Sequence, residues 1–328
     1  MGYTEGKNKY LYQIIDDIAN NLISSVDITD GYNHWTNADI TWNTSNTTGN
    51  NAKRALKYQN GSEMIYVALE VRNTWYSCYS GYTAKGLRIT FSSHWDSTVN
   101  SYVGAIQQTS IPFLAYSGAQ PVPPPDLATT YIEYYLWVES NGFAIMARSY
   151  PNTLANGDNS FFAVVERCPN KFYNDNQPNF YCYNVMNIWP TFCGYSWYAE
   201  ADLHRSLLRP FIYKWPNATV SDRTPNSYSM IFGSYDRSHG FKSAISGKAY
   251  FARPIIFNNV LEVGQSATGI NPTPIFQSDI WFYWSENMGL NDGDIISMEG
   301  QTTKYQVKYL DTLPDSASKI TYAIKFVA

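Results

Sequence analysis

A histidine lies beside a carboxylate in the segment His94-Trp95-Asp96, and another histidine precedes a tryptophan at His34-Trp35. An imidazole next to a carboxylate is the pairing that general-base catalysis uses. No nucleophile elbow of the GxSxG type accompanies these residues, although hydrolases place one beside such a base. We therefore expect polar residues at a strand end here, with a catalytic dyad as the less favoured alternative.

Glycoside hydrolysis needs only two carboxylates about 5 to 10 Å apart and aromatic platforms for the sugar rings. Four glutamates with aromatic residues nearby are candidates: Glu133, Glu139, Glu166 and Glu286. Their positions in the sequence do not show whether any two meet in space, and a chain with 27 acidic residues places some of them near aromatics by chance. We therefore keep a glycosidase as a minor alternative and predict no catalytic residue and no enzyme activity.

Sugar binding without catalysis needs only exposed aromatic rings and a few hydrogen-bonding groups. Trp189, Tyr195 and Trp197 are candidates for stacking, with Asn179 and Asp175 to supply hydrogen bonds. The same rings are equally suited to a core or to subunit contacts, and we favour that interpretation.

Cysteine spacing and glycine spacing give no reason to expect a metal ion or a cofactor. The four cysteines, Cys78, Cys168, Cys182 and Cys193, form no CxxC pair, and the four histidines are scattered. We expect mostly buried thiols, with disulfide pairing as the alternative. The glycine clusters at 264–269 and 289–293 lack the lysine and the spacing of a phosphate-binding loop.

The segment that follows the polar N-terminus has the periodicity of one amphipathic helix within residues 1–27. Its apolar positions recur at helical spacing and include Leu11, Ile14, Ile15, Ile18 and Leu22. Such a stripe either packs on the chain's own sheet or docks into a partner; we favour packing on the chain's own sheet, with docking as the alternative. The N-terminal residues do not have the pattern of a secretion signal, and no apolar run is long enough to span a membrane.

Alternating strands separated by turn residues predict a mainly β fold with antiparallel, sandwich-like domains. The clearest set is Thr130 to Val165, where strands on both sides of Ser140-Asn141-Gly142 form a hairpin and a third strand follows. We predict a first β domain at 28–120, a central β-sandwich domain at 126–260 and a small C-terminal β module at 270–328. At the proline-rich segment 121–125 the chain either changes domain or crosses between sheets. The C-terminal module alone has a marginal core, so it is expected to lean on another domain or on a partner.

Composition points to a surface built for contact. Charged residues make up 15% of the 328 residues and aromatic residues 16%, including 28 tyrosines. Tyrosine and tryptophan provide large contact areas with few rotatable bonds, as subunit interfaces and sugar sites require. The formal net charge of −4 and the lack of a basic patch argue against nucleic-acid binding.

Several stretches resemble structural proteins of tailed bacteriophages. They are residues 35–71, 84–96, 138–167 and 279–309, the last of which looks like the terminal module of tail or neck components. The resemblance implies a non-enzymatic virion protein of the neck, tail or baseplate, assembled in the host cytoplasm from identical copies and other virion proteins. The alternative is a carbohydrate-binding or receptor-binding module of the same kind of particle, with a host surface glycan as its partner.

Overall fold

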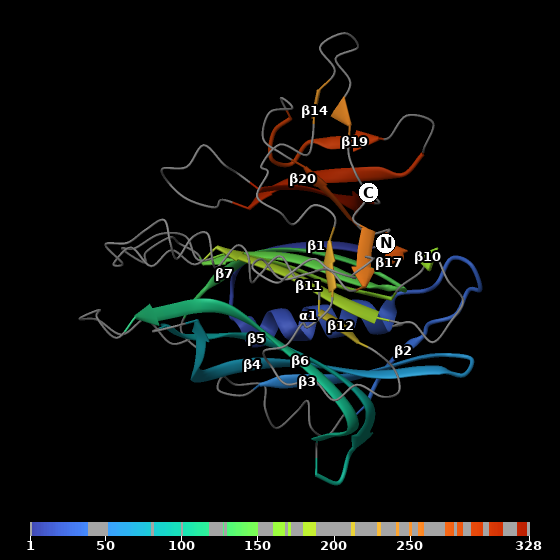
Figure 1. Ribbon diagram of the computed structural model, residues 1–328, viewed down its shortest axis with the longest axis vertical. Coiled ribbons are helices and arrows are strands. Elements are labelled where there is room, and N and C mark those ends of the chain that lie inside the picture. Colours follow the sequence, from blue (N-terminus) through green and yellow to red (C-terminus); the bar gives the residue numbers. More distant parts are fainter. Residues whose placement is uncertain are drawn as a thin grey trace, which may run out of the picture.

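The computed structural model describes residues 2–38, 52–79, 82–99, 101–117, 127, 130–149, 160–167, 170–171, 180–187, 211–213, 228–230, 241–242, 249–250, 255–258, 273–278, 281–284, 290–297, 302–310 and 320–326. The fold is mainly β, with antiparallel sheets and a single helix in these ranges. Three layers of strands lie one above another (Figure 1).

The first sheet contains a hairpin whose turn is Asn60-Gly61. Gly61 adopts a φ of 57°, which a tight turn between two strands requires. On either side of it, the whole of β3 (Lys53–Asn60) pairs with the first half of β4 (Glu63–Tyr79). The chain then adds β5 (Tyr82–Asp96) and β6 (Ser101–Ser117), while β2 (Trp35–Asn37) pairs with β3 at the other edge. The resulting five-stranded sheet has the order β2-β3-β4-β5-β6.

The predicted hairpin and third strand between Thr130 and Val165 form the centre of a six-stranded sheet. They are β7 (Ile132–Glu139), β8 (Gly142–Ser149) and β9 (Ser160–Arg167), each antiparallel to the next. β11 (Phe180–Asn187) and β12 (Phe211–Tyr213) extend the sheet on one side. β1 (Gly2–Lys9) extends it on the other, in the order β1-β7-β8-β9-β11-β12.

The N-terminal range 1–27 is a strand followed by a helix, which corrects the prediction of a helix alone. β1 pairs with β7, with Gly2 opposite Val138. α1 (Leu11–Ser24) begins where the amide of Tyr10 donates to Oε1 of Gln13 at 2.9 Å. The strand was missed because its residues are polar and only partly buried, as is common at a sheet edge.

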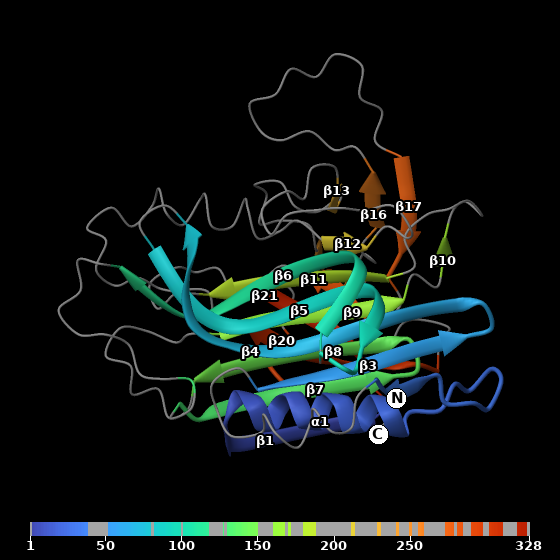
Figure 2. The ribbon, with the colours of Figure 1, turned by 90° about the horizontal axis from the view of Figure 1, so that it is seen from below.

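The helix packs against the chain's own sheets. α1 and β1 lie side by side along one edge of the two sheets (Figure 2). Buried in the core are all the side chains that we considered for docking: Leu11, Ile14, Ile15, Ile18 and Leu22. They contact the chain's own sheets, so the docking-helix interpretation is corrected to an internal one.

One hydrophobic core joins the two large sheets. Side chains of α1, β3, β4, β5, β7, β8, β9 and β11 all contribute to it. Strands within 35–117 and within 132–213 therefore belong to two facing sheets of a single sandwich, which corrects the prediction of a separate domain in each of the ranges 28–120 and 126–260. Of the two readings of the proline-rich segment, the crossing between sheets agrees with this core, although residues 121–125 themselves lie outside the described ranges.

The outer face of the six-stranded sheet is covered by a third sheet from the C-terminal module. That sheet consists of β18 (Trp281–Trp284), β19 (Ile295–Ser297), β20 (Lys304–Leu310) and β21 (Ile320–Phe326), in the order β18-β21-β20-β19. Lys325 pairs with Glu139 at 3.1 Å, and the Phe326 ring lies 5.2 Å from the Tyr3 ring. The module thus leans on the rest of the chain, as its small core requires.

Short strands complete the description. β10 (Asn170–Lys171), β13 (Tyr228–Met230), β16 (Ile255–Asn258) and β17 (Thr273–Gln277) form a sheet in the order β10-β17-β16-β13. β14 (Phe241–Lys242) pairs with β15 (Ala249–Tyr250). Within the described ranges, α1 is too short and too polar to cross a membrane.

Candidate functional site

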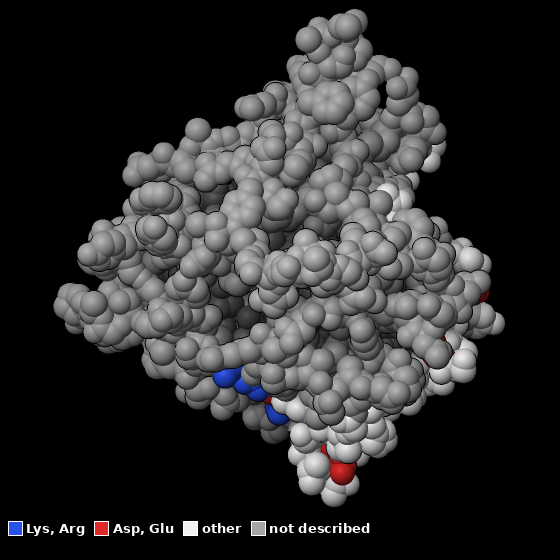
Figure 3. All heavy atoms as spheres, viewed as in Figure 1, with Lys and Arg blue, Asp and Glu red and all other residues white. Residues whose placement is uncertain are grey.

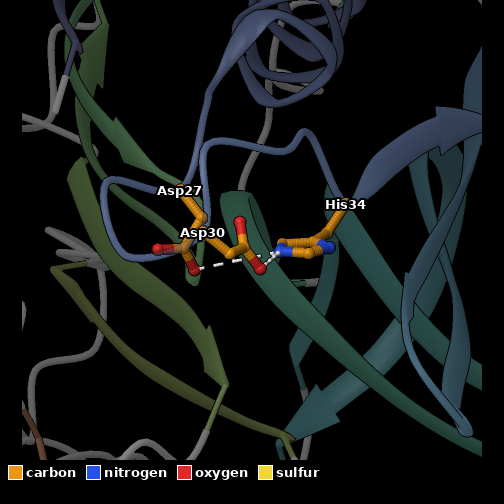
Figure 4. Close-up of side chains that lie close together, drawn as sticks. All are labelled: Asp27, Asp30 and His34. Atoms are coloured by element: carbon orange, nitrogen blue, oxygen red, sulfur yellow. Dashed lines mark hydrogen bonds and ion pairs between the residues drawn. The ribbon is translucent and has the colours of Figure 1, made fainter.

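The loop between α1 and β2 gathers two carboxylates and an imidazole. Asp27, Asp30 and His34 each present one ligand atom, and these atoms all lie within 4.8 Å of one another. Figure 4 shows the two carboxylates facing the ring of His34. Nε2 of His34 lies 3.0 Å from Oδ2 of Asp30 and 3.9 Å from Oδ2 of Asp27.

Backbone hydrogen bonds fix the two aspartates. The amide of Thr29 donates to Oδ1 of Asp27 at 2.8 Å, and the amide of Tyr32 donates to Oδ1 of Asp30 at 2.9 Å. Both are Asx-type turns, in which a carboxylate accepts from an amide two residues later. The loop closes on itself because the Asp27 amide donates to the Tyr32 carbonyl at 2.9 Å. In each carboxylate, Oδ1 therefore accepts a backbone hydrogen bond and Oδ2 faces His34.

The imidazole of His34 is fixed by β3. Its Nδ1 lies 3.1 Å from the carbonyl oxygen of Gln59, and the Gln59 amide donates to the His34 carbonyl at 2.9 Å. A carbonyl oxygen only accepts, so Nδ1 carries the hydrogen and Nε2 faces the carboxylates. The ring is thus held with Nδ1 on the Gln59 carbonyl and Nε2 directed at the two carboxylates.

The electrostatics of the site favour the charged form of Asp27. The amide of Thr29 lowers the pKa of Asp27, burial opposes this, and the hydroxyls of Thr29 and Ser140 and the charge of His34 lower the pKa further. The side chains of Asp27 and His34 are 13% and 7% exposed, whereas that of Asp30 is 36% exposed. The site therefore opens to solvent on the side of Asp30.

An aromatic base supports the loop. Trp35 follows His34 and is buried, with Nε1 donating to the carbonyl of Ser140 at 2.8 Å. Its ring meets the Tyr58 ring edge-on at 5.1 Å, and Tyr58 also contacts the His34 ring at 5.6 Å. The guanidinium of Arg167 lies over the other aromatic, Tyr58, at 5.8 Å and pairs with Glu63 at 2.7 Å. The guanidinium beside these aromatic rings is therefore already paired with Glu63.

The second histidine segment singled out in the sequence, His94-Trp95-Asp96, is not part of this cluster. His94 lies on β5, and its ring contacts the Tyr66 ring at 5.9 Å. The carboxylate of Asp96 accepts from the Thr98 amide at 2.8 Å in an exposed turn. The backbone amide and side-chain hydroxyl of Thr98 lower the pKa of Asp96. This is the polar strand-end arrangement that we favoured for His94 and Asp96.

Three of the four candidate glutamates project onto the outer face of the six-stranded sheet. Register places Glu139 and Glu166 on either side of Gly142, two strands apart. Glu166 is fully buried and accepts from Oγ of Ser278 at 2.7 Å, while Glu139 is paired with Lys325. Glu133 is buried at the other end of β7. Among the described residues, each of these carboxylates is thus engaged by partners within the chain, and Glu286 lies outside the described residues.

The remaining candidates are placed only in part. Trp189, Tyr195, Trp197, Asn179 and Asp175 lie outside the described residues. Cys182 carries a buried thiol, as predicted for the cysteines. Cys168 and Cys193 also fall outside the described ranges, and of Cys78 only the backbone on β4 is described.

Sequence reasoning noticed His34 but not its partners. The available signal was the spacing Asp-x-x-Asp-x-x-x-His just after a helix, in a segment rich in turn residues.

Comparisons with protein-family models, with curated proteins and with solved structures find no match to this chain.

Proposed function

We propose that this chain is a non-enzymatic structural subunit of a tailed-phage virion, which assembles in multiple copies in the tail, baseplate or neck. Support comes from the stretches that resemble phage structural proteins and from the low content of charge and high content of tyrosine. On the face drawn in Figure 3, the described residues at the lower end are mostly uncharged, with few basic and acidic side chains among them.

The observation that carries the proposal is the 26–32 loop, residues 26 to 32. Its apolar side chains point outward: Val26 is 54% exposed, Ile28 97% and Tyr32 69%. Exposed apolar groups gathered on one segment are typical of a contact surface. The same loop is held by the Asp27 and Asp30 turns and by its closing hydrogen bonds, so little conformational entropy is lost when a partner covers it.

Self-association of the full chain tests this proposal. We expect sedimentation velocity and light scattering to show oligomers that grow with concentration, or closed rings by electron microscopy. Ile28→Asp should weaken the association by about 10- to 100-fold, because burying one large apolar side chain contributes about 1.5 to 3 kcal/mol. Val99→Asp is the matched control, since Val99 is also exposed, at 64%, but lies on the β5–β6 turn.

A monomer at every concentration, or equal effects of the two substitutions, would contradict assembly through this loop.

The second candidate, carbohydrate binding, is favoured by one observation. Tyr10 stacks on Tyr12 and on Tyr131, with ring centroids 5.7 and 4.8 Å apart, and Tyr131 is 40% exposed. Glycan binding by an isolated monomer that Tyr131→Ala abolishes would support this function instead.

A further inference from the structure

The ring of His34 directs one nitrogen at two carboxylate oxygens. Because Nδ1 carries the hydrogen that reaches Gln59, Nε2 of a neutral ring presents a lone pair. That lone pair faces Oδ2 of Asp30 at 3.0 Å and Oδ2 of Asp27 at 3.9 Å. Three electron-rich atoms directed at one another repel unless a proton or a metal ion lies between them.

A proton satisfies only half of this arrangement. On Nε2 it would make a hydrogen bond to Asp30, but Asp27 lies at 3.9 Å, beyond hydrogen-bond range. A tetrahedral zinc ion with bonds of about 2.0 to 2.1 Å separates its ligand atoms by about 3.3 to 3.4 Å. The separations of 3.0 and 3.9 Å from Nε2 of His34 lie on either side of this value, so modest rotations of the Asp30 and Asp27 side chains bring both oxygens to it.

All three side chains are oriented from behind. Thr29 holds Asp27, Tyr32 holds Asp30 and the Gln59 carbonyl holds His34, in each case through the atom that does not face the centre. Metal sites use this kind of outer support, in which the second nitrogen of a ligating histidine donates to a carbonyl or carboxylate. A cluster of acidic residues alone would lack the buried, oriented imidazole.

We propose that Asp27, Asp30 and His34 bind a divalent transition-metal ion, with Zn²⁺ as the ion that fits best. An imidazole nitrogen in the set favours Zn²⁺ over Ca²⁺ and Mg²⁺, which prefer oxygen ligands throughout. The partly exposed Asp30 side provides entry for the ion and room for water at the remaining coordination position. This site goes beyond the proposed assembly role and does not depend on it. Its effect would be to tie the 26–32 loop to β3 through His34.

Zinc binding by the full chain, with any affinity tag removed and metal stripped by a chelator, tests the proposal. We expect one equivalent of Zn²⁺ by calorimetry and by elemental analysis, and a rise in melting temperature with added Zn²⁺. Asp30→Asn keeps an oxygen for the Tyr32 amide but removes the charge that faces the ion. The affinity of the Asp30→Asn variant for Zn²⁺ should fall by at least about 10- to 100-fold, because this is the loss that follows when a group supporting a metal ligand is removed.

Asp96→Asn is the matched control, because Asp96 accepts an amide hydrogen bond in the same kind of turn but belongs to no group of three metal-ligand side chains among the described residues. It should leave zinc binding unchanged. The proposal is overturned if no zinc binds, since a proton then occupies the position, or if zinc binds and Asp30→Asn and Asp27→Asn leave it intact, since the cysteines then hold it. Co²⁺ substitution adds a check, because its visible spectrum distinguishes oxygen and nitrogen ligands from thiolates.

Discussion

Glu133 illustrates how a charge is kept inside this protein. Its side chain is only 3% exposed, yet Lys7 lies 3.1 Å away, Arg148 donates to its other oxygen, and the Tyr135 hydroxyl donates at 3.0 Å. Burial raises the pKa of Glu133, but the hydrogen bonds from Arg148 and Lys7 outweigh it, so the pKa lies below its ordinary value of 4.5. The ionised form is therefore the one that stabilises the fold.

The pH dependence of stability follows from that direction. A carboxyl with a lowered folded-state pKa contributes stability above about pH 4.5, and this contribution is lost as the pH falls through the folded pKa. Glu133→Gln should reduce the free energy of unfolding by about 1 to 2 kcal/mol at pH 7. We expect the difference from the parent protein to shrink in acid, as measured by urea unfolding between pH 3 and 7.

Exposed Glu5 provides the comparison, since its replacement by Gln should change these curves little. A Glu133→Gln difference that stayed constant with pH would show that the effect is one of packing and not of charge.

At the scale of elements, the β7–β8 hairpin depends on one glycine. Gly142 has a φ of 149°, and a Cβ placed there would lie 2.0 Å from the carbonyl oxygen of Val165 on β9. The neighbouring strand thus comes too close for any side chain at this position. Gly61, in the β3–β4 turn, has a φ of 57° but nothing within 4 Å of its Cβ position.

The two glycines predict different costs for the same substitution. Gly142→Ala should destabilise the protein by about 2 to 4 kcal/mol, because backbone strain and a clash with backbone add together. Gly61→Ala should cost only about 1 to 2 kcal/mol, the penalty of a left-handed conformation alone. Chemical denaturation of both variants checks the order, and equal values would refute the role assigned to the close approach of β9.

Hairpins and buried stripes were the predictable part of this fold. Turn residues at Asn60-Gly61 and Ser140-Asn141-Gly142 mark their hairpins locally, and the spacing of Ile14, Ile15 and Ile18 marks the helix. The pairing of β1 with β7 was not predictable, because polar edge residues carry little pattern and the partner strand is far along the chain. The metal-ligand cluster was missed because Asp27 and Asp30 converge on His34 only after two turns have bent the loop.

For the whole molecule, the decisive feature is that the central sheet is buried on both faces. The inner face of β7 packs on the core through Leu136, and the outer face places Trp137 at 0% exposure near Tyr3. Lys308 of the C-terminal module lies 3.6 Å from the Tyr135 ring centroid on that outer face. This explains why large and mostly apolar side chains lie on both faces of β7, with Glu133 and Glu139 as the charged exceptions.

Removal of residues 279–328 should therefore expose a broad apolar surface. We expect the truncated chain to bind a hydrophobic dye, to lose solubility and to show red-shifted tryptophan fluorescence. Lys325→Ala, which removes the ion pair with Glu139 but leaves the module in place, should change these properties little. A truncated protein that stays soluble and binds no dye would mean that the module is not needed to cover the sheet.

The pairing of Gly2 with Val138 also has a consequence for synthesis on the ribosome. The first strand emerges long before the strand that it pairs with, by on the order of 10 s at ordinary translation rates. During that interval the nascent segment has no place in a sheet, and the apolar stripe of α1 has only part of its eventual covering. A chaperone that shields nascent chains would have its greatest effect in this interval.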